Sequence, residues 1–264
     1  MIINPYLVQP SGPSYDPDAQ SFFTATGITD NTQMNAINQF VLDLKSNSLW
    51  TKGKYMYLGF LGDSTKCKYN LFNTTETLTF NGGWTFDSVG MQGNGINAYA
   101  NTNIPFTTYI TSATSVTGGA YIQTNTASGA DFGVSDGASF SKGITLFSRA
   151  DATTTYYSVS DLITNGTVGT SVNTQAHFTI FRNDNSTKYI YRNGTQIGTY
   201  SGSANTLGAL YTTFLSARNI DNSALSYSSR KYSAQYLFDG FTTTQAGNLH
   251  TCINTMMTTL GINV

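Results

Sequence analysis

The first regular pattern in the chain is an amphipathic helix that follows the N-terminal twenty residues. Asp30 is a favourable N-cap, and Gln33 stands three residues later, as a capping box requires. The apolar positions recur at the spacing of one helix face: Ile37, Val41 and Leu44, flanked by Met34 and Phe40. The pattern predicts a helix over residues 31–45 that packs its apolar face on the rest of the fold.

The chain returns to a helical pattern at its C-terminal end. Thr242 and Gln245 form a second capping pair, and Gly261 suits the position just past a helix end. Between them an apolar stripe runs at helical spacing through Leu249, Ile253, Met256 and Leu260. We therefore predict a second helix over residues 243–260.

Between these helices the pattern changes to short alternating segments separated by glycine, asparagine and aspartate, which is typical of a β-sandwich. The candidate strands lie at 55–62, 77–86, 121–125, 144–150, 156–160, 177–184, 188–200, 211–219 and 231–241. Asn193-Gly194 supplies two residues that tolerate positive φ, so residues 189–200 predict a hairpin with a type I′ turn. Asn165-Gly166 predicts another turn. The fold class is all-β, with one N-terminal and one C-terminal helix on a single domain over residues 21–264.

Residues 1–20 hold four of the five prolines in the chain. Proline fixes φ and disfavours helix at the preceding residue, so we expect an extended arm, with a short helical turn at 18–26 that Gly27 closes. The arm is either a disordered leader or a segment that docks on a neighbouring subunit. The candidate docking residues are Ile2, Ile3, Pro5, Tyr6, Leu7 and Val8.

The content of charged residues limits the kinds of partner that the protein is expected to bind. Charged residues make up only 10% of the 264 residues, against about 25% in an ordinary soluble protein, and the net charge is −1. No run of lysine and arginine exists, so we expect neither a nucleic-acid partner nor electrostatic attachment to a membrane. No apolar run is long enough to span a membrane, and the N-terminal residues predict no signal peptide.

The residues that usually carry catalysis or bind metals are scarce. Glu76 is the only glutamate and has no acidic neighbour, whereas a glycosidase needs a pair of carboxylates. We predict no catalytic residue and no enzyme activity. The two histidines, His177 and His250, are expected to be structural or surface residues rather than metal ligands. For Cys67 and Cys252 we favour two buried free thiols, with a disulfide left open.

The sequence contains one candidate calcium site and two candidate tryptophans for a sugar site. Asp131 and Asp136 bracket a glycine-rich stretch that could bind Ca²⁺, although ordinary turn chemistry is favoured, so no cofactor is predicted. A sugar site usually combines an exposed aromatic ring with nearby amides. Trp50 and Trp84 are candidates, but buried tryptophan is commoner. The sequence alone places no carbohydrate-binding residue.

Two sets of segments resemble known families. YIYRNGTQIGTY followed by LYTTFLSARN resembles a laminin-G-like, concanavalin A-like jelly roll. The stretch DPDAQSFFTATGITDNTQMNAINQFVLDLKSNSLWTKGKYMYLGFLG, together with KYNLFN, TFNGGWTF, GNGINAYANT and the closing YLFDGFTTTQAGNLHTCINTMMTTLG, resembles structural proteins of tailed phages, including crAss-like phages. The second resemblance brackets nearly the whole chain.

The resemblance implies a concanavalin A-like jelly-roll β-sandwich on a virion surface: a head fibre, a capsid decoration protein or a tail-associated fibre. Such proteins are often trimeric and contact other virion proteins, so a homo-oligomer, with a trimer favoured, is expected. Assembly in the host cytoplasm and release by lysis would fit, as would adhesion to host or mucosal glycans. The alternatives are a free-standing carbohydrate-binding module or receptor-binding adhesin and, less favoured, a polysaccharide depolymerase.

Overall fold

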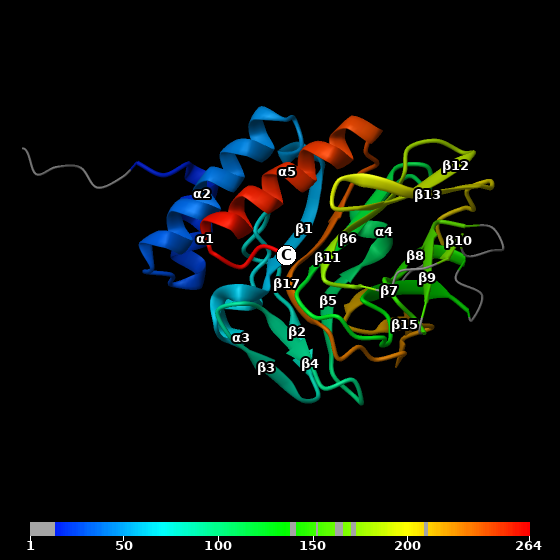
Figure 1. Ribbon diagram of the computed structural model, residues 1–264, viewed down its shortest axis with the longest axis horizontal. Coiled ribbons are helices and arrows are strands. Elements are labelled where there is room, and N and C mark those ends of the chain that lie inside the picture. Colours follow the sequence, from blue (N-terminus) through cyan, green and yellow to red (C-terminus); the bar gives the residue numbers. More distant parts are fainter. Residues whose placement is uncertain (1–13, 138–140, 152, 162–165, 170–172, 209–210) are drawn as a thin grey trace, which may run out of the picture.

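The computed structural model describes residues 14–137, 141–151, 153–161, 166–169, 173–208 and 211–264. Helices form one layer beside two packed β-sheets (Figure 1). The helical layer consists of α1 (Pro17–Thr26), α2 (Asn31–Ser46) and α5 (Thr243–Thr259). Shorter helical segments connect the strands: η1 (Trp50–Lys52), η2 (Gly59–Leu61), α3 (Ser64–Cys67) and α4 (Phe106–Tyr109).

Sheet I has the strand order β13-β12-β11-β6-β17-β4-β3, and β1 also pairs with β17. All its pairings are antiparallel. Its strands are β1 (Gly53–Leu58), β3 (Trp84–Phe86), β4 (Met91–Gly93), β6 (Val116–Ile122), β11 (Ala176–Arg182), β12 (Thr187–Arg192), β13 (Thr195–Ser201) and β17 (Lys231–Phe238).

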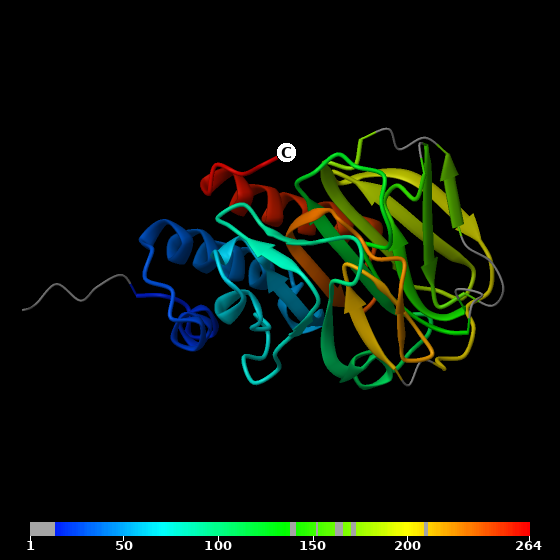
Figure 2. The same cartoon turned by 90° about the horizontal axis from the view of Figure 1, so that it is seen from below.

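Sheet II has the order β10-β9-β8-β7-β14-β5-β2, and β15 joins it through one parallel pairing with β7. Its strands are β2 (Thr79–Asn81), β5 (Tyr99–Pro105), β7 (Phe132–Asp136), β8 (Ser141–Phe147), β9 (Thr154–Val159), β10 (Gly166–Gly169), β14 (Thr212–Leu215), β15 (Arg218–Ile220) and β16 (Ser223–Leu225). The chain is therefore mostly β, as predicted, with two sheets that form a sandwich (Figure 2).

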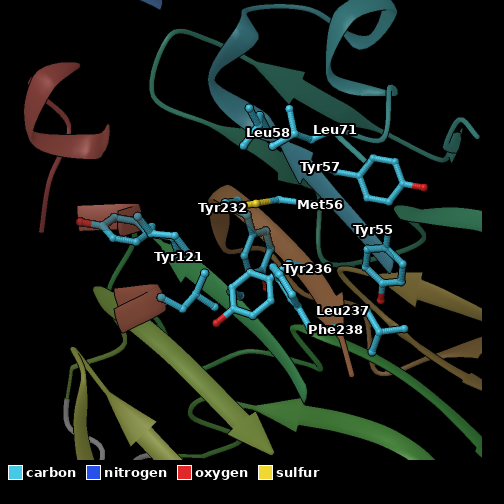
Figure 3. Packing of buried hydrophobic residues seen from close by; sticks show 14 of the residues in the cluster. Tyr55, Met56, Tyr57, Leu58, Leu71, Tyr121, Tyr232, Tyr236, Leu237 and Phe238 are labelled. Carbon is cyan, nitrogen blue, oxygen red and sulfur yellow. The ribbon is translucent and has the colours of Figure 1, made fainter. Parts of the chain in front are cut away.

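Both faces of sheet I are covered at its centre. Every residue of β6 and β11 is buried, although successive strand residues point to opposite faces. In β1 the four consecutive side chains from Tyr55 to Leu58 are likewise buried (Figure 3). Sheet II packs on one face and α5 on the other (Figure 1). Strands buried on both faces read as continuous apolar runs, which explains why strict alternation is weak here.

The predicted helices and hairpin are confirmed. The Asp30 side chain accepts from Gln33 N (2.8 Å), and Thr242 with Gln245 forms a complete capping box. Asn193 (φ 48°) and Gly194 (φ 73°) make the turn between β12 and β13. The turn predicted at Asn165-Gly166 is only partly within the described residues, because residue 165 is outside them.

The predicted boundary of the N-terminal arm is wrong. The helical turn predicted over residues 18–26 and closed by Gly27 is confirmed as α1. This helix begins at Pro17, so residues 17–20 are helical rather than extended and the sandwich carries two N-terminal helices rather than one. Pro17 occupies the first helical position, where its missing N–H costs nothing, and the Asp16 side chain caps the helix by accepting from Asp18 N (3.0 Å). The candidate docking residues Ile2, Ile3, Pro5, Tyr6, Leu7 and Val8 lie outside the described residues.

Charged groups are buried inside the fold. Arg230 pairs with Asp131 at 2.8 Å, and Asp161 binds both Arg182 and Lys188. These five side chains are at most 5% exposed. Cys67 and Cys252 are buried free thiols, as favoured. None of the described helices is long and apolar enough to cross a membrane.

Candidate functional site

A surface hollow of about 420 Å³ lies on the β3–β4 hairpin. The hairpin is at the end of sheet I, where β3 is the edge strand. In its register Trp84 faces Gly93 and Thr85 faces Gln92, and the backbone bond from Asn94 N to Gly83 O (3.0 Å) extends the pairing. The hollow is lined by residues from both strands and their flanks: Gly83, Trp84, Thr85, Gln92, Gly93 and Asn94.

Trp84 is half-buried and held in one orientation. Its indole Nε1 donates to the carbonyl of Asn81 (2.9 Å). Phe80 contacts the ring edge to face at 5.1 Å between centroids, and Phe86 lies at 6.1 Å with nearly parallel planes. A ring fixed by a hydrogen bond and two aromatic neighbours loses little further freedom when a ligand contacts it.

The polar groups around the hollow are also fixed. Asn94 Oδ1 accepts from the backbone N–H groups of residues 96, 97 and 98 at 2.9–3.1 Å, which locks the turn between β4 and β5. Gln92 Nε2 donates to Ser229 O (2.8 Å). Thr85 is exposed beside them, and Ile96, at the tip of the locked turn, is 76% exposed.

The residues that line the hollow suit the binding of a ligand. None of the six lining residues carries a charge or an ionisable side chain, so the hollow itself supplies no general acid or base. An aromatic ring in an uncharged lining suits a neutral, partly apolar ligand, because the ring can pack on its carbon atoms.

Trp50 lies at a second hollow, of about 460 Å³, with Asp18, Lys45, Ser48 and Thr51. Its ring is already engaged, because Lys45 Nζ is 5.3 Å from its centroid and Phe72 packs at 4.7 Å. Burial opposes the charge on Lys45, but bonds of 2.6 Å to Asp16 and Asp18 raise its pKa. The lining of this hollow is charged, whereas that of the Trp84 hollow is not.

Glu76, the single glutamate of the chain, stabilises the loop in which it lies. Glu76 Oε2 accepts from Tyr109 Oη (2.8 Å) and Asn70 Nδ2 (2.9 Å), and Oε1 accepts from Asn73 Nδ2 (2.9 Å). Burial and the neighbouring Tyr57 and Glu76 raise the pKa of the Tyr109 phenol. The carboxylate is thus held by three side-chain donors from its own loop and from α4.

The structure does not bring the two candidate calcium ligands together. Asp131 and Asp136 stand at opposite ends of β7, Asp131 in its buried pair with Arg230 and Asp136 at 3.5 Å from Lys142. Among the described residues, no group of three or more histidine, cysteine or acidic side chains could hold a metal ion. The two histidines, by contrast, meet: their Nδ1 atoms are 3.1 Å apart.

The comparisons with known proteins bear on the fold. No family model and no curated protein matches the sequence. A Trypanosoma rangeli sialidase mutant that displays trans-sialidase activity is similar in structure, with a TM-score of 0.54 and 9% identity, over 84% of this chain and 39% of that one. The binding domain of botulinum neurotoxin serotype D has a TM-score of 0.52 and 9% identity, over 77% and 52%.

The binding domain of Paraclostridial Mosquitocidal Protein 1 has a TM-score of 0.50 and 14% identity, over 76% of this chain and 52% of that one. The chain therefore spans between about two fifths and about half of the length of these proteins. Identities this low establish the fold alone. The chain is a β-sandwich of the lectin-like jelly-roll type.

Proposed function

We propose that the chain is a lectin-like adhesin that binds a neutral saccharide at the Trp84 hollow. The observation that carries this proposal is an indole ring held in place at the rim of an uncharged hollow. The CH face of a pyranose packs on the indole, and the backbone of β3, which is the edge strand of the sheet, offers polar groups to its hydroxyls. Ile96 would contact any apolar substituent that extends beyond the ring.

The known structures of this fold support a binding role. Two of them are named as binding domains of clostridial toxins, and a third is a sialidase of which this chain matches less than half. A polysaccharide depolymerase is less favoured, because Glu76 is bonded to three neighbouring side chains and the hollow offers no carboxylate.

A screen of the full chain against immobilised glycans tests the binding proposal. We expect retention on neutral hexose or N-acetylhexosamine glycans, with sialylated forms bound no better. The exchange Trp84→Ala should weaken retention, and Thr51→Ala, at the second hollow, is the control. Absence of binding to every neutral glycan, or equal loss in both variants, would remove the Trp84 hollow as the site.

We further propose that this adhesin is displayed on a tailed-phage particle. Support comes from the resemblance of its N-terminal, central and C-terminal segments to phage structural proteins and from its low content of charged residues. Residues 1–13 would anchor the protein to the particle or to a neighbouring copy in a trimer. If protein lacking these residues occupied the particle at full stoichiometry, the anchoring role would be refuted.

A further inference from the structure

The only two histidines of the chain meet where α5 packs on sheet I. His177 is on β11 and His250 on α5, and their Nδ1 atoms are 3.1 Å apart, within hydrogen-bond distance. The ring planes differ by 14° and the centroids are 5.3 Å apart. The rings thus share one N–H···N hydrogen bond between a strand and a helix that are 73 residues apart in the sequence.

This bond continues into the sheet. His177 Nε2 is 2.7 Å from Tyr236 Oη, which is itself 2.7 Å from Thr179 Oγ1 and 3.3 Å from the carbonyl of Phe178. His177 is only 1% exposed, while His250 is half-buried. A proton taken up from solvent by His250 therefore reaches a buried chain of hydrogen bonds.

The protonation state of the two imidazoles determines whether their hydrogen bond can persist. A neutral imidazole has one N–H and one lone pair, so two neutral rings form one bond. One added proton is tolerated, because His177 can accept at Nδ1 and donate from Nε2 to Tyr236. A second added proton places two N–H donors and two positive charges face to face.

Among the described residues, the groups hydrogen bonded to or stacked on these rings carry no charge that would relieve this repulsion. Tyr121 of β6 lies 5.9 Å from the His177 ring, Tyr236 belongs to β17, and the neutral Asn193-Gly194 turn contacts His250. Burial, followed by the neighbouring His250, holds the pKa of His177 well below its ordinary value, and burial lowers the pKa of His250.

We propose that the His177–His250 pair is an acid-sensitive latch that holds α5 on sheet I and releases it when both imidazoles are protonated. The latch does not depend on the proposed saccharide site, since no residue that lines the Trp84 hollow belongs to it. Release would expose the apolar face of α5 at acidic pH: Ala246, Leu249, Ile253, Met256 and Met257.

The two buried thiols provide the test. Cys252 is on α5, two residues beyond His250, whereas Cys67 is on α3. The full chain is treated with 4,4′-dithiodipyridine, which reacts in acid, and the modification rate of each thiol is followed by peptide mass spectrometry from pH 7.5 to 4. Opening that takes up one extra proton becomes about tenfold more populated per pH unit. We expect the Cys252:Cys67 rate ratio to rise at least about tenfold.

In His250→Gln the ratio should rise much less over the same range, because only His177 is left to take up a proton on opening. Thr251→Ala, an exposed exchange next to it, should behave as the unmodified chain. Near-ultraviolet circular dichroism at pH 7.5 checks that each variant is folded. A constant ratio in the unmodified chain would overturn the latch. So would a parallel rise at both thiols, because that result indicates global unfolding rather than release of α5.

Discussion

Arg230 Nη1 lies 2.8 Å from Asp131 Oδ1, and both side chains are fully buried between the sheets. The carboxylate also accepts from Ser148 N (2.6 Å) and Tyr232 Oη (2.9 Å). Burial opposes the charge of Arg230, and its attraction to Asp131 nevertheless raises the guanidinium pKa. A buried pair with this many hydrogen bonds ties β7 of sheet II to the start of β17 in sheet I.

Removal of one partner should therefore be costly. Asp131→Asn leaves the Arg230 charge buried without its counter-ion, and we expect a loss of about 3–5 kcal/mol in the free energy of unfolding. The control is Asp87→Asn, which breaks an ion pair with Lys231 that is partly open to solvent and should cost less than about 1 kcal/mol. Urea denaturation at pH 7 compares the two. Equal effects would mean that the buried pair has no special role.

Two glycines test how tightly the latch region is packed. A Cβ at Gly119 would lie 2.1 Å from Tyr236 Oη and 2.3 Å from the Phe178 carbonyl, so Gly119→Ala should destabilise the fold by at least about 1–3 kcal/mol. Gly247 is inside α5, with no neighbouring atom within 4 Å of its Cβ position. Gly247→Ala should stabilise by up to about 1 kcal/mol. Thermal unfolding of both variants would show opposite shifts in Tm, and shifts of the same sign would contradict this packing.

A carboxylate at the start of α3 should respond to acid. Hydrogen bonding from Thr65 lowers the pKa of Asp63 to about 2, with help from Lys66 and against partial burial. Since this pKa is lower in the folded state, its stabilising effect is full above the ordinary pKa of about 3.9 and is lost as the pH falls toward 2. Because the Asp63 side chain is 43% exposed, solvent screens its interactions, and the effect should stay below about 1 kcal/mol.

The carboxyl chemical shift of Asp63, followed by NMR from pH 6 to 1.5, measures this pKa directly. The variant Asp63→Asn should be less stable than the unmodified chain at pH 6 and equally stable near pH 2. A midpoint near 4 for the carboxyl shift would show that the cap bonds at 2.9 Å to Thr65 N and 3.0 Å to Lys66 N contribute nothing.

The sequence predicted those elements that depend on contacts between residues close together in the chain. The capping residues Asp30 and Thr242 and the Asn193-Gly194 turn act within a few residues, and each is found as predicted. The first helix is predicted over residues 18–26, but the prolines also predict extended chain up to residue 20. Pro17 instead occupies the one helical position that accepts proline readily, so the helix begins there.

The remaining features depend on contacts between distant segments. Nothing near Asp131 in the sequence indicates that Arg230, 99 residues away, neutralises it. Both histidines read as isolated, although the fold places them 3.1 Å apart. Trp84 was one of two candidate rings, and only its neighbours Phe80, Phe86 and Asn81 distinguish it from Trp50, which Lys45 and Phe72 cover.

The most direct test of the account is the affinity of the Trp84→Ala variant for the glycan that the unmodified chain retains best. Isothermal titration calorimetry of the full chain, Trp84→Ala and the control Thr51→Ala gives three dissociation constants. The proposed stacking predicts a Kd at least about tenfold weaker for Trp84→Ala, equivalent to about 1.4 kcal/mol, and an unchanged Kd for the control. An unchanged Kd for a folded Trp84→Ala variant would contradict the saccharide site.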